Sequence, residues 1–112
     1  MNNISFDDFM KVEICVGTIL SAEINNNLNN PAIVLTIDFG KKIGIKKSSA
    51  QLIANYTCDS LVKKQILAVV NFAPRQVGKI ISEVLVLGLS DNNNQPVLIS
   101  PDSNVKNGKK LY

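Results

Sequence analysis

A chain of 112 residues that is 46% hydrophobic and 19% charged, with a net charge of +3, has the length and composition of one globular domain, which we expect to span residues 1–112. It contains no histidine, no glycine-rich nucleotide motif and no CxxC pair, which disfavours imidazole-based catalysis, nucleotide cofactors and zinc or redox sites. Its polar, acidic start and its short apolar runs lack the features of a secretory signal and of a membrane helix. Composition therefore predicts a cytoplasmic, non-enzymatic protein with no cofactor and no metal.

The first residues are predicted to form one short amphipathic helix. Ser5, with Asp8 three residues later, can accept a free amide at the start of a helical turn. Phe6, Phe9 and Met10 then share one side of that turn. This apolar side would be presented before any strand has begun.

A strand is expected next, because Val12, Ile14 and Val16 recur on one parity, at the period of a half-buried strand. Gly17 is expected to mark a bend or a bulge in this strand. The asparagine-rich stretch Asn25–Pro31 can supply neither a ladder nor a core, so it is predicted to be a surface loop.

The middle of the chain is predicted to form a hairpin and then a helix. Two β-branched, apolar runs, Ala32–Phe39 and Ile43–Lys47, flank the turn Gly40–Lys42, a pattern typical of a hairpin. The serine pair Ser48–Ser49 can cap a short helix over Ala50–Tyr56, whose apolar residues share one face.

Two further strands complete the expected set. The continuous apolar run Gln65–Phe72 predicts a buried strand, and Ile81–Leu89 predicts a fifth strand after a turn around Gly78. The loop Asp91–Gln95 then leads to a turn-rich tail that begins with a short strand, Val97–Ser100. Five strands with a short helix between the third and the fourth predict an all-β fold, a five-stranded Greek-key barrel of the OB type with terminal extensions. Another small β-barrel is the alternative.

Charge is unevenly distributed along the chain. Residues 1–40 carry one lysine and five acidic residues, a balance of −4. Residues 41–79 carry seven lysines and Arg75 with one acidic residue, Asp59, a balance of +7, and the remaining residues are balanced. The central block predicts an anionic partner for one face of the protein, or else a solvated surface.

Several motifs, in order and over nearly the whole chain, resemble the tRNA-binding OB-fold family. This family includes free-standing tRNA-binding proteins, C-terminal appendages of some methionyl-tRNA synthetases, and secretion chaperones of the CsaA type, to which the resemblance is closest. The stretches that carry it are Phe6–Glu23, Ile37–Gly40, Ile43–Gln51, Leu61–Gly88, and within the last of these Val69–Arg75 and Ser82–Gly88. The resemblance implies an OB fold and the binding of tRNA or another structured RNA.

One position departs from the family pattern. The first strand of the family usually reads Asp-Ile-Arg-Val-Gly, whereas this chain reads Glu13-Ile14-Cys15-Val16-Gly17. If the arginine supports binding, its role is absent here or is taken over by a nearby lysine.

The resemblance places the RNA-binding surface near the third strand and around the turn between the fourth and fifth strands. The residues of this sequence in those regions are Lys46, Lys47, Ser48, Ser49, Asn71, Arg75, Lys79, Ser82 and Glu83. The lysines and the arginine would contact phosphates, while Asn71 and Ser82 could read a base edge or a 2′-hydroxyl group. Because Phe72 is the one aromatic residue nearby, a folded RNA is favoured over a threaded single strand.

Each polar residue of this set also has a purely structural interpretation. Asn71 and Ser82 flank a turn, where such side chains often satisfy backbone groups. Glu83 can brace Arg75 or a loop amide. The pairs Lys41–Lys42 and Lys63–Lys64 are predicted to keep turns and strand edges soluble.

The chain ends are predicted to join two copies in a homodimer. Too many apolar side chains lie near the ends for a small barrel to cover, and the resemblance also implies a dimer joined through the terminal regions. The residues predicted at the interface are Phe6, Phe9, Met10, Val97, Ile99, Val105 and Tyr112.

Three classes of function remain open from the sequence. Binding of tRNA predicts an affinity that falls steeply with salt. A chaperone that captures unfolded or precursor polypeptides, which the resemblance also implies, predicts a weak dependence on salt. An enzyme is disfavoured, although an activity based on Cys15 or Cys58 stays open.

Overall fold

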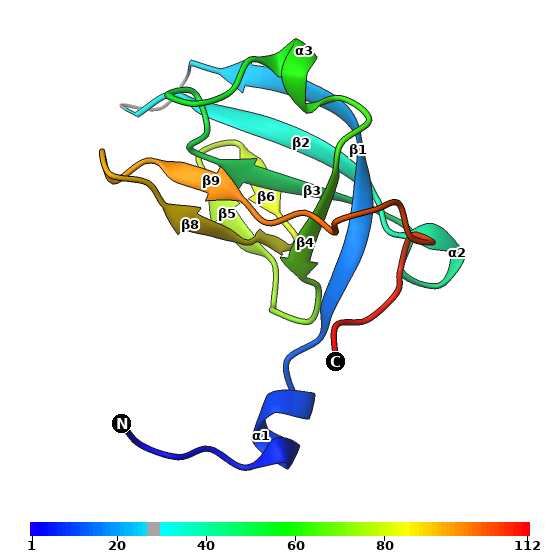
Figure 1. Cartoon of the computed structure of the whole chain (residues 1–112). Helices are drawn as coiled ribbons and strands as arrows, with labels where there is room; N and C mark the ends of the chain where they lie inside the picture. Colours follow the sequence, from blue (N-terminus) through cyan, green and yellow to red (C-terminus); the bar gives the residue numbers. More distant parts are fainter. Residues whose placement is uncertain (27–29) are drawn as a thin grey trace.

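A computed structural model describes residues 1–26 and 30–112 and shows a curled β structure with short helices (Figure 1). Residues 27–29, within the asparagine-rich stretch predicted as a loop, lie outside the described residues. The elements in chain order are α1 Phe6–Met10, β1 Ile14–Asn25, β2 Ala32–Asp38, α2 Gly40–Ile43, β3 Ile45–Ala50, α3 Cys58–Leu61, β4 Gln65–Val69, β5 Arg75–Val77, β6 Ile80–Ser82, β7 Leu85–Val86, β8 Gly88–Ser90 and β9 Pro96–Leu98.

The barrel is built on the 12-residue strand β1, which pairs antiparallel with β4 along its first half and with β2 along its second half. β3 extends the sheet beyond β2, and β7 extends it beyond β4, which gives the order β3-β2-β1-β4-β7. The two edges meet just after β6, where the amide of Glu83 donates to the carbonyl of Lys47 at 2.7 Å. This curled antiparallel sheet is the predicted all-β barrel of the OB type, so the predicted fold class is confirmed.

β2 supplies much of the core, because its alternate residues Ile33, Leu35 and Ile37 are fully buried, as is Phe39 just after the strand. Burying one such side chain contributes about 1.5 to 3 kcal/mol. Gly17 of β1 faces this cluster, and a Cβ atom there would lie 2.6 Å from Cγ2 of Ile37 and 2.7 Å from Cδ1 of Phe39. The glycine is therefore required by packing.

The pairing of β1 with β2 is irregular between Ile19 and Ser21. The bulge predicted at Gly17 is therefore wrong in position, because the signal that Gly17 gives in the sequence comes from close packing.

The last residues, 105–112, form what we call the tail, which runs antiparallel beside the first half of β1. The amide of Gly108 donates to Val16 O at 2.8 Å, Val16 N donates to Lys109 O at 3.0 Å, and Leu111 N donates to Ile14 O at 2.7 Å. Along this half of β1, the neighbours Cys15 and Val16 are both buried, at 4% and 2% exposure, so both faces of the strand are covered. The alternation predicted for a half-buried strand does not hold there.

The helix at the N-terminus is confirmed: α1 starts after Ser5, whose hydroxyl accepts the amide of Asp8 at 3.0 Å. The helix predicted over Ala50–Tyr56 is wrong, because Ser48 and Ser49 belong to β3 and a turn follows them. A helix forms later, at α3, where Thr57 and Ser60 each accept the other's amide at 3.1 Å. No helix in the described part of the chain is long and apolar enough to cross a lipid bilayer.

The strand predicted over Ile81–Leu89 is interrupted. β6 pairs with β5, β7 pairs with β4, and β8 pairs with β9, so three short strands serve three different partners where one was expected. The turn predicted between β2 and β3 is the single-turn helix α2, and the strand predicted over Gln65–Phe72 ends at Val69.

Candidate nucleic-acid interface

The seam between β3 and β6 is held by two residues that the sequence predicts as RNA contacts. Oγ of Ser82 accepts the amide of Ser49 at 3.1 Å, and Oε1 of Glu83 accepts the amide of Lys47 at 3.1 Å. Oε2 of Glu83 also lies 3.9 Å from Nζ of Lys46. Ser82 is buried, so these two side chains act first on the protein's own backbone.

A groove of about 780 Å³ opens beside this seam. It is bounded by β3, by the loop between β4 and β5, by residues 82–88, and by the turn before β9. Five of the predicted RNA contacts line it, from three separate segments of the chain: Ser48, Ser49, Arg75, Ser82 and Glu83. Phe72, with 57% of its surface exposed, and Arg75 lie on its β4–β5 side.

The other predicted contacts lie outside the groove. Lys47 is exposed on β3, next to the groove residue Ser48, and Lys46 is half-buried beside Glu83. Lys79 is exposed at the tip of the β5–β6 hairpin, where Gly78 has a φ of 63°. Three exposed cations, Lys47, Arg75 and Lys79, are therefore available for phosphates.

Asn71 fastens the segment that follows α1. Its Oδ1 accepts the amide of Glu13 at 3.0 Å, and its Nδ2 donates to the carbonyl of Lys11 at 2.8 Å. The amide of Val70 donates to Glu13 O at 2.9 Å beside it. The side chain of Asn71 thus ties the loop that leads to Arg75, at the start of β5, to the residues that follow α1.

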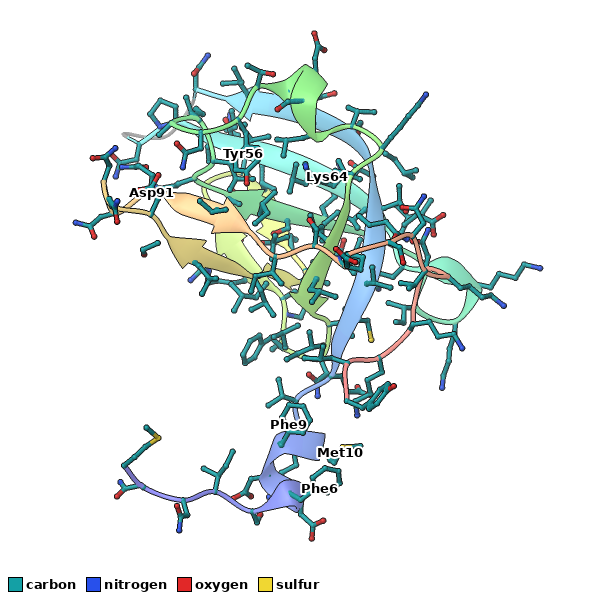
Figure 2. All side chains as sticks on the ribbon, in the orientation of Figure 1. Phe6, Phe9, Met10, Tyr56, Lys64 and Asp91 are labelled. Atoms are coloured by element: carbon teal, nitrogen blue, oxygen red, sulfur yellow. The ribbon has the colours of Figure 1, made fainter. Side chains whose placement is uncertain are left out.

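The predicted dimer residues fall into two groups. Phe6, Phe9 and Met10 lie on α1, which projects away from the barrel and has no buried residue (Figure 2). The other group belongs to β9 and the residues after it. Val97 is in β9, the backbone of Ile99 bonds to that of Leu67 and Leu87, and the backbone of Val105 bonds to the side chain of Gln65. Tyr112 is fully exposed at the end of the tail.

One wall of the groove was not predicted from the sequence. Asn94, Gln95, Pro96 and Leu98 line it from the β8–β9 hairpin. Asn55 and Tyr56, in the turn after β3, hold this hairpin: Asn55 Nδ2 donates to Asp91 Oδ2 at 2.9 Å and to Pro96 O at 3.1 Å, and Leu98 N donates to Tyr56 Oη at 2.9 Å. The sequence shows an ordinary turn here, and no signal in it indicates that this turn borders a groove.

Two titratable groups are perturbed. The amide of Gln95, the side chain of Asn55 and the amide of Asn93 lower the pKa of Asp91 by hydrogen bonding to its carboxylate. Burial raises the pKa of the Cys15 thiol and Glu13 raises it further, while Lys110 and Lys42 oppose them. Lys110 also forms a β-bridge with Cys15, so a lysine lies next to the position where the family pattern has arginine.

A curled five-stranded barrel with an open groove on one side and exposed cations beside it defines an OB-fold binding domain. Residues 14–110 match the family described as "Putative tRNA binding domain", and the chain belongs to that family. The family resemblance seen in the sequence is thus confirmed.

The relatives include enzymes and chaperones. The methionine–tRNA ligase of Parabacteroides distasonis is 32% identical over 111 residues, which are 97% of this chain and 16% of the ligase. That of Pyrococcus horikoshii is 30% identical over 99% of this chain and 15% of the ligase. The chain therefore spans about one sixth of the length of these ligases.

Two solved structures are similar over their whole length. The chaperone CsaA from Bacillus anthracis has a TM-score of 0.92 and 40% identity, covering 99% of this chain and 100% of that one. The CsaA chaperone protein from Picrophilus torridus has a TM-score of 0.90 and 44% identity, covering 98% and 100%.

Proposed function

We propose that the protein binds tRNA through a basic face made of β3, the β5–β6 hairpin and the groove beside them. The observation that carries this proposal is the meeting of residues from three segments in one groove, in a chain that belongs to the tRNA-binding domain family. Exposed Lys47 and Lys79 supply positive charge around it. A tRNA offers both the phosphate backbone and the folded shape that such a face fits.

The residues of this face divide by role. Lys47 and Lys79 are point charges for phosphates, and Arg75 can bind one phosphate with two nitrogens or stack on a base. Phe72 can stack on an unpaired base at the groove. Ser82 and Glu83 position Lys47, since both accept backbone amides of β3, and Asn71 fixes the start of the loop that contains Phe72 by bonding to the backbone of Lys11 and Glu13.

The proposed role is binding without catalysis, in the cytoplasm where tRNA is used. The whole ligases are enzymes by name, but this chain matches only 16% of the length of one of them, and residues 14–110 of this chain match the family described as a putative tRNA binding domain. The proposal also includes a two-fold homodimer joined through α1, because this helix buries none of its residues and exposes the side chains of Phe6 and Met10.

Salt dependence of tRNA affinity tests the proposed face. The double variant Lys47→Ala/Lys79→Ala should bind tRNA more weakly than the wild type, because two phosphates are no longer neutralised by the protein. The slope of log affinity against log salt should flatten by about 0.7 to 0.9 for each of these phosphates. Fluorescence titrations of labelled tRNA at four salt concentrations measure both quantities.

A matched control separates this effect from a general loss of charge. Lys63→Ala/Lys64→Ala removes the same charge from the turn between α3 and β4, and it should leave the slope unchanged. A wild type that does not bind tRNA at low salt, or a Lys47→Ala/Lys79→Ala slope equal to that of the wild type, contradicts the proposal.

The apolar side chains of the groove favour a second candidate, the binding of an unfolded polypeptide. Leu52, Phe72 and Leu98 line the groove together with polar residues, which suits an extended chain with alternating side chains. The structures of similar length and sequence are titled as chaperones. Capture of an unfolded polypeptide that persists at high salt and is abolished by Phe72→Ser would favour this candidate over tRNA.

A further inference from the structure

Helix α2 and the tail lie against each other although they are about 65 residues apart in sequence. A Cβ atom at Gly40 would lie 2.7 Å from the carbonyl oxygen of Asn107, and one at Gly108 would lie 2.5 Å from that of Phe39. The two backbones are therefore in direct contact, and Figure 1 shows the tail passing beside α2. Glycine is needed at both places, because Gly40 and Gly108 also have φ values of 89° and 92°.

This contact is fastened from several directions. Oδ1 of Asn107 accepts the hydroxyl of Thr18 at 2.8 Å and Nε2 of Gln65 at 3.1 Å. Gln65 also bonds to both the amide and the carbonyl of Val105. Together with the pairing of the tail to β1, these bonds fix where the lysines of the tail emerge.

The two segments together carry five lysines. They are Lys41 and Lys42 on α2 and Lys106, Lys109 and Lys110 on the tail, which we call the α2–tail surface. The ion pairs found among residues 1–26 and 30–112 involve none of the five. Lys110 donates to Met10 O at 3.2 Å and forms a β-bridge with Cys15, while the contact of Gly40 with Asn107 brings the lysine pair of α2 against the tail.

Acidic groups offset only part of this charge. Asp38 lies at the start of α2, where its Oδ1 accepts the amide of Gly40 at 2.8 Å, and Glu13 lies near Cys15. The two segments themselves, residues 40–43 and 105–112, carry five lysines and no acidic residue. The excess is invisible in the sequence, where residues 80–112 as a whole are electrically balanced.

We propose that the α2–tail surface is a second contact surface for the phosphate backbone of a structured RNA. β3 begins at Ile45, with Gly44 alone between it and α2, so the exposed Lys47 follows Lys42 by only five residues along the chain. An RNA held at β3 and the β5–β6 hairpin can therefore extend its backbone across α2 to the tail. Lysine suits this role because an ammonium group neutralises a phosphate without demanding one geometry. The proposal rests on the proposed binding of tRNA.

Two double variants test the surface from its two segments. Lys41→Ala/Lys42→Ala and Lys106→Ala/Lys109→Ala should each weaken tRNA binding and flatten the salt slope by about 0.7 to 0.9 for every phosphate that is no longer neutralised. Lys110 is left in place because it bonds to Met10 O. The control Lys63→Ala/Lys64→Ala removes an equal charge and should keep the wild-type slope. Thermal unfolding of each variant verifies the fold.

The outcomes separate this inference from the proposed function. If Lys47→Ala/Lys79→Ala flattens the slope but neither α2–tail variant does, the second surface is refuted and the first stands. If all variants, the control included, flatten the slope equally, the effect is one of net charge and the second surface is refuted as well. If the wild type fails to bind tRNA, the same comparison on an RNA duplex of about 16 base pairs decides, and failure to bind the duplex overturns both.

Discussion

Ser82, Glu83 and Asn71 have the donors and acceptors that could read an RNA, and in the folded protein they use them on its own backbone. Ser82 accepts an amide of β3, and Glu83 accepts the amide of Lys47. Asn71 accepts the amide of Glu13 and donates to the carbonyl of Lys11. A side chain that holds the binding surface in shape affects RNA binding without touching RNA. Variants at these positions must therefore be examined for stability as well as for affinity.

Ser82→Ala is expected to destabilise the protein by about 1 to 3 kcal/mol, because it leaves the amide of Ser49 without its acceptor next to a buried position. Urea unfolding followed by circular dichroism measures this. Ser103→Ala, in an exposed turn, is the control and should be neutral. A Ser82→Ala variant that keeps wild-type stability but no longer prefers tRNA over an RNA duplex would instead make Ser82 a reader of RNA.

For single residues, the sequence predicts which ones lie near the proposed RNA-binding surface, but not whether each contacts RNA or supports the protein's own backbone. Whether a polar side chain is free to contact RNA depends on hydrogen-bond partners that are 33 to 58 residues away in sequence, as for Ser82 with Ser49 and Asn71 with Glu13. Gly17 shows the same limit, since a glycine required by packing and one at a bulge look alike until Ile37 and Phe39 are placed.

At the scale of helices and strands, some local sequence signals favoured one element, and the pairing with distant strands produced another. Ser48 and Ser49 have the chemistry of a helix cap, yet β3 uses them because β2 pairs with this stretch on one side and Ser82 bonds to it on the other. Thr57 and Ser60 form the reciprocal cap where no strand partner intervenes. The first four of the five predicted strands form as β1 to β4, whereas the division of the fifth, Ile81–Leu89, into three strands was not predictable, because it reflects partners that change along the run.

Asp91 organises the β8–β9 hairpin, and its stabilising effect should depend on pH. Its lowered pKa means that the fold favours the carboxylate. The stabilisation is therefore present above the ordinary carboxyl pKa of about 3.9 and is lost as pH falls through the lower value in the folded protein. Asp91→Ala should lower the midpoint of thermal unfolding at pH 7, and its difference from the wild type should shrink toward pH 2.

Asp102→Ala serves as the control for this pH series, because it removes an exposed carboxylate before the tail. A difference between Asp91→Ala and the wild type that stays constant from pH 7 to pH 2 would show that the hairpin does not depend on the ionised carboxylate. Since Asn94, Gln95 and Pro96 of this hairpin line the groove, its loosening should also be visible in ligand affinity.

For the molecule as a whole, one basic surface was predictable from the charge of a single sequence block, whereas the second arises only when folding brings two distant segments together. The block at residues 41–79 supplies Lys47, Arg75 and Lys79, as its balance of +7 indicated. The α2–tail surface adds lysines from a segment of neutral balance, because the tail pairs with β1 beside α2. A long anionic partner can thus be met at two places on one barrel.

The homodimer is the prediction that involves the whole molecule, and it starts from a helix that cannot be stable alone. α1 has five residues, far fewer than the 12 to 15 or so at which isolated helices become even marginally stable, and it buries none of them. Phe6 is 71% exposed, and its ring is tilted by 50° against that of Phe9, with the ring centres 6.3 Å apart. Lys110 bonds to Met10 O, so the exposed Leu111 and Tyr112 emerge beside α1 and can be covered by the same partner.

A second copy of the chain would cover these groups by a two-fold arrangement, and it would let one tRNA contact two basic faces with a gain from effective concentration. Light scattering should therefore give about twice the monomer mass of 12.2 kDa, and Phe6→Asp/Phe9→Asp should return the mass to that of the monomer and weaken tRNA binding together. Ile24→Asp, at a position that is 54% exposed near the end of β1 far from α1, is the matched control and should change neither. A monomeric wild type at micromolar concentration would remove the dimer from the mechanism, and so would a monomeric variant that binds tRNA as tightly as the wild type.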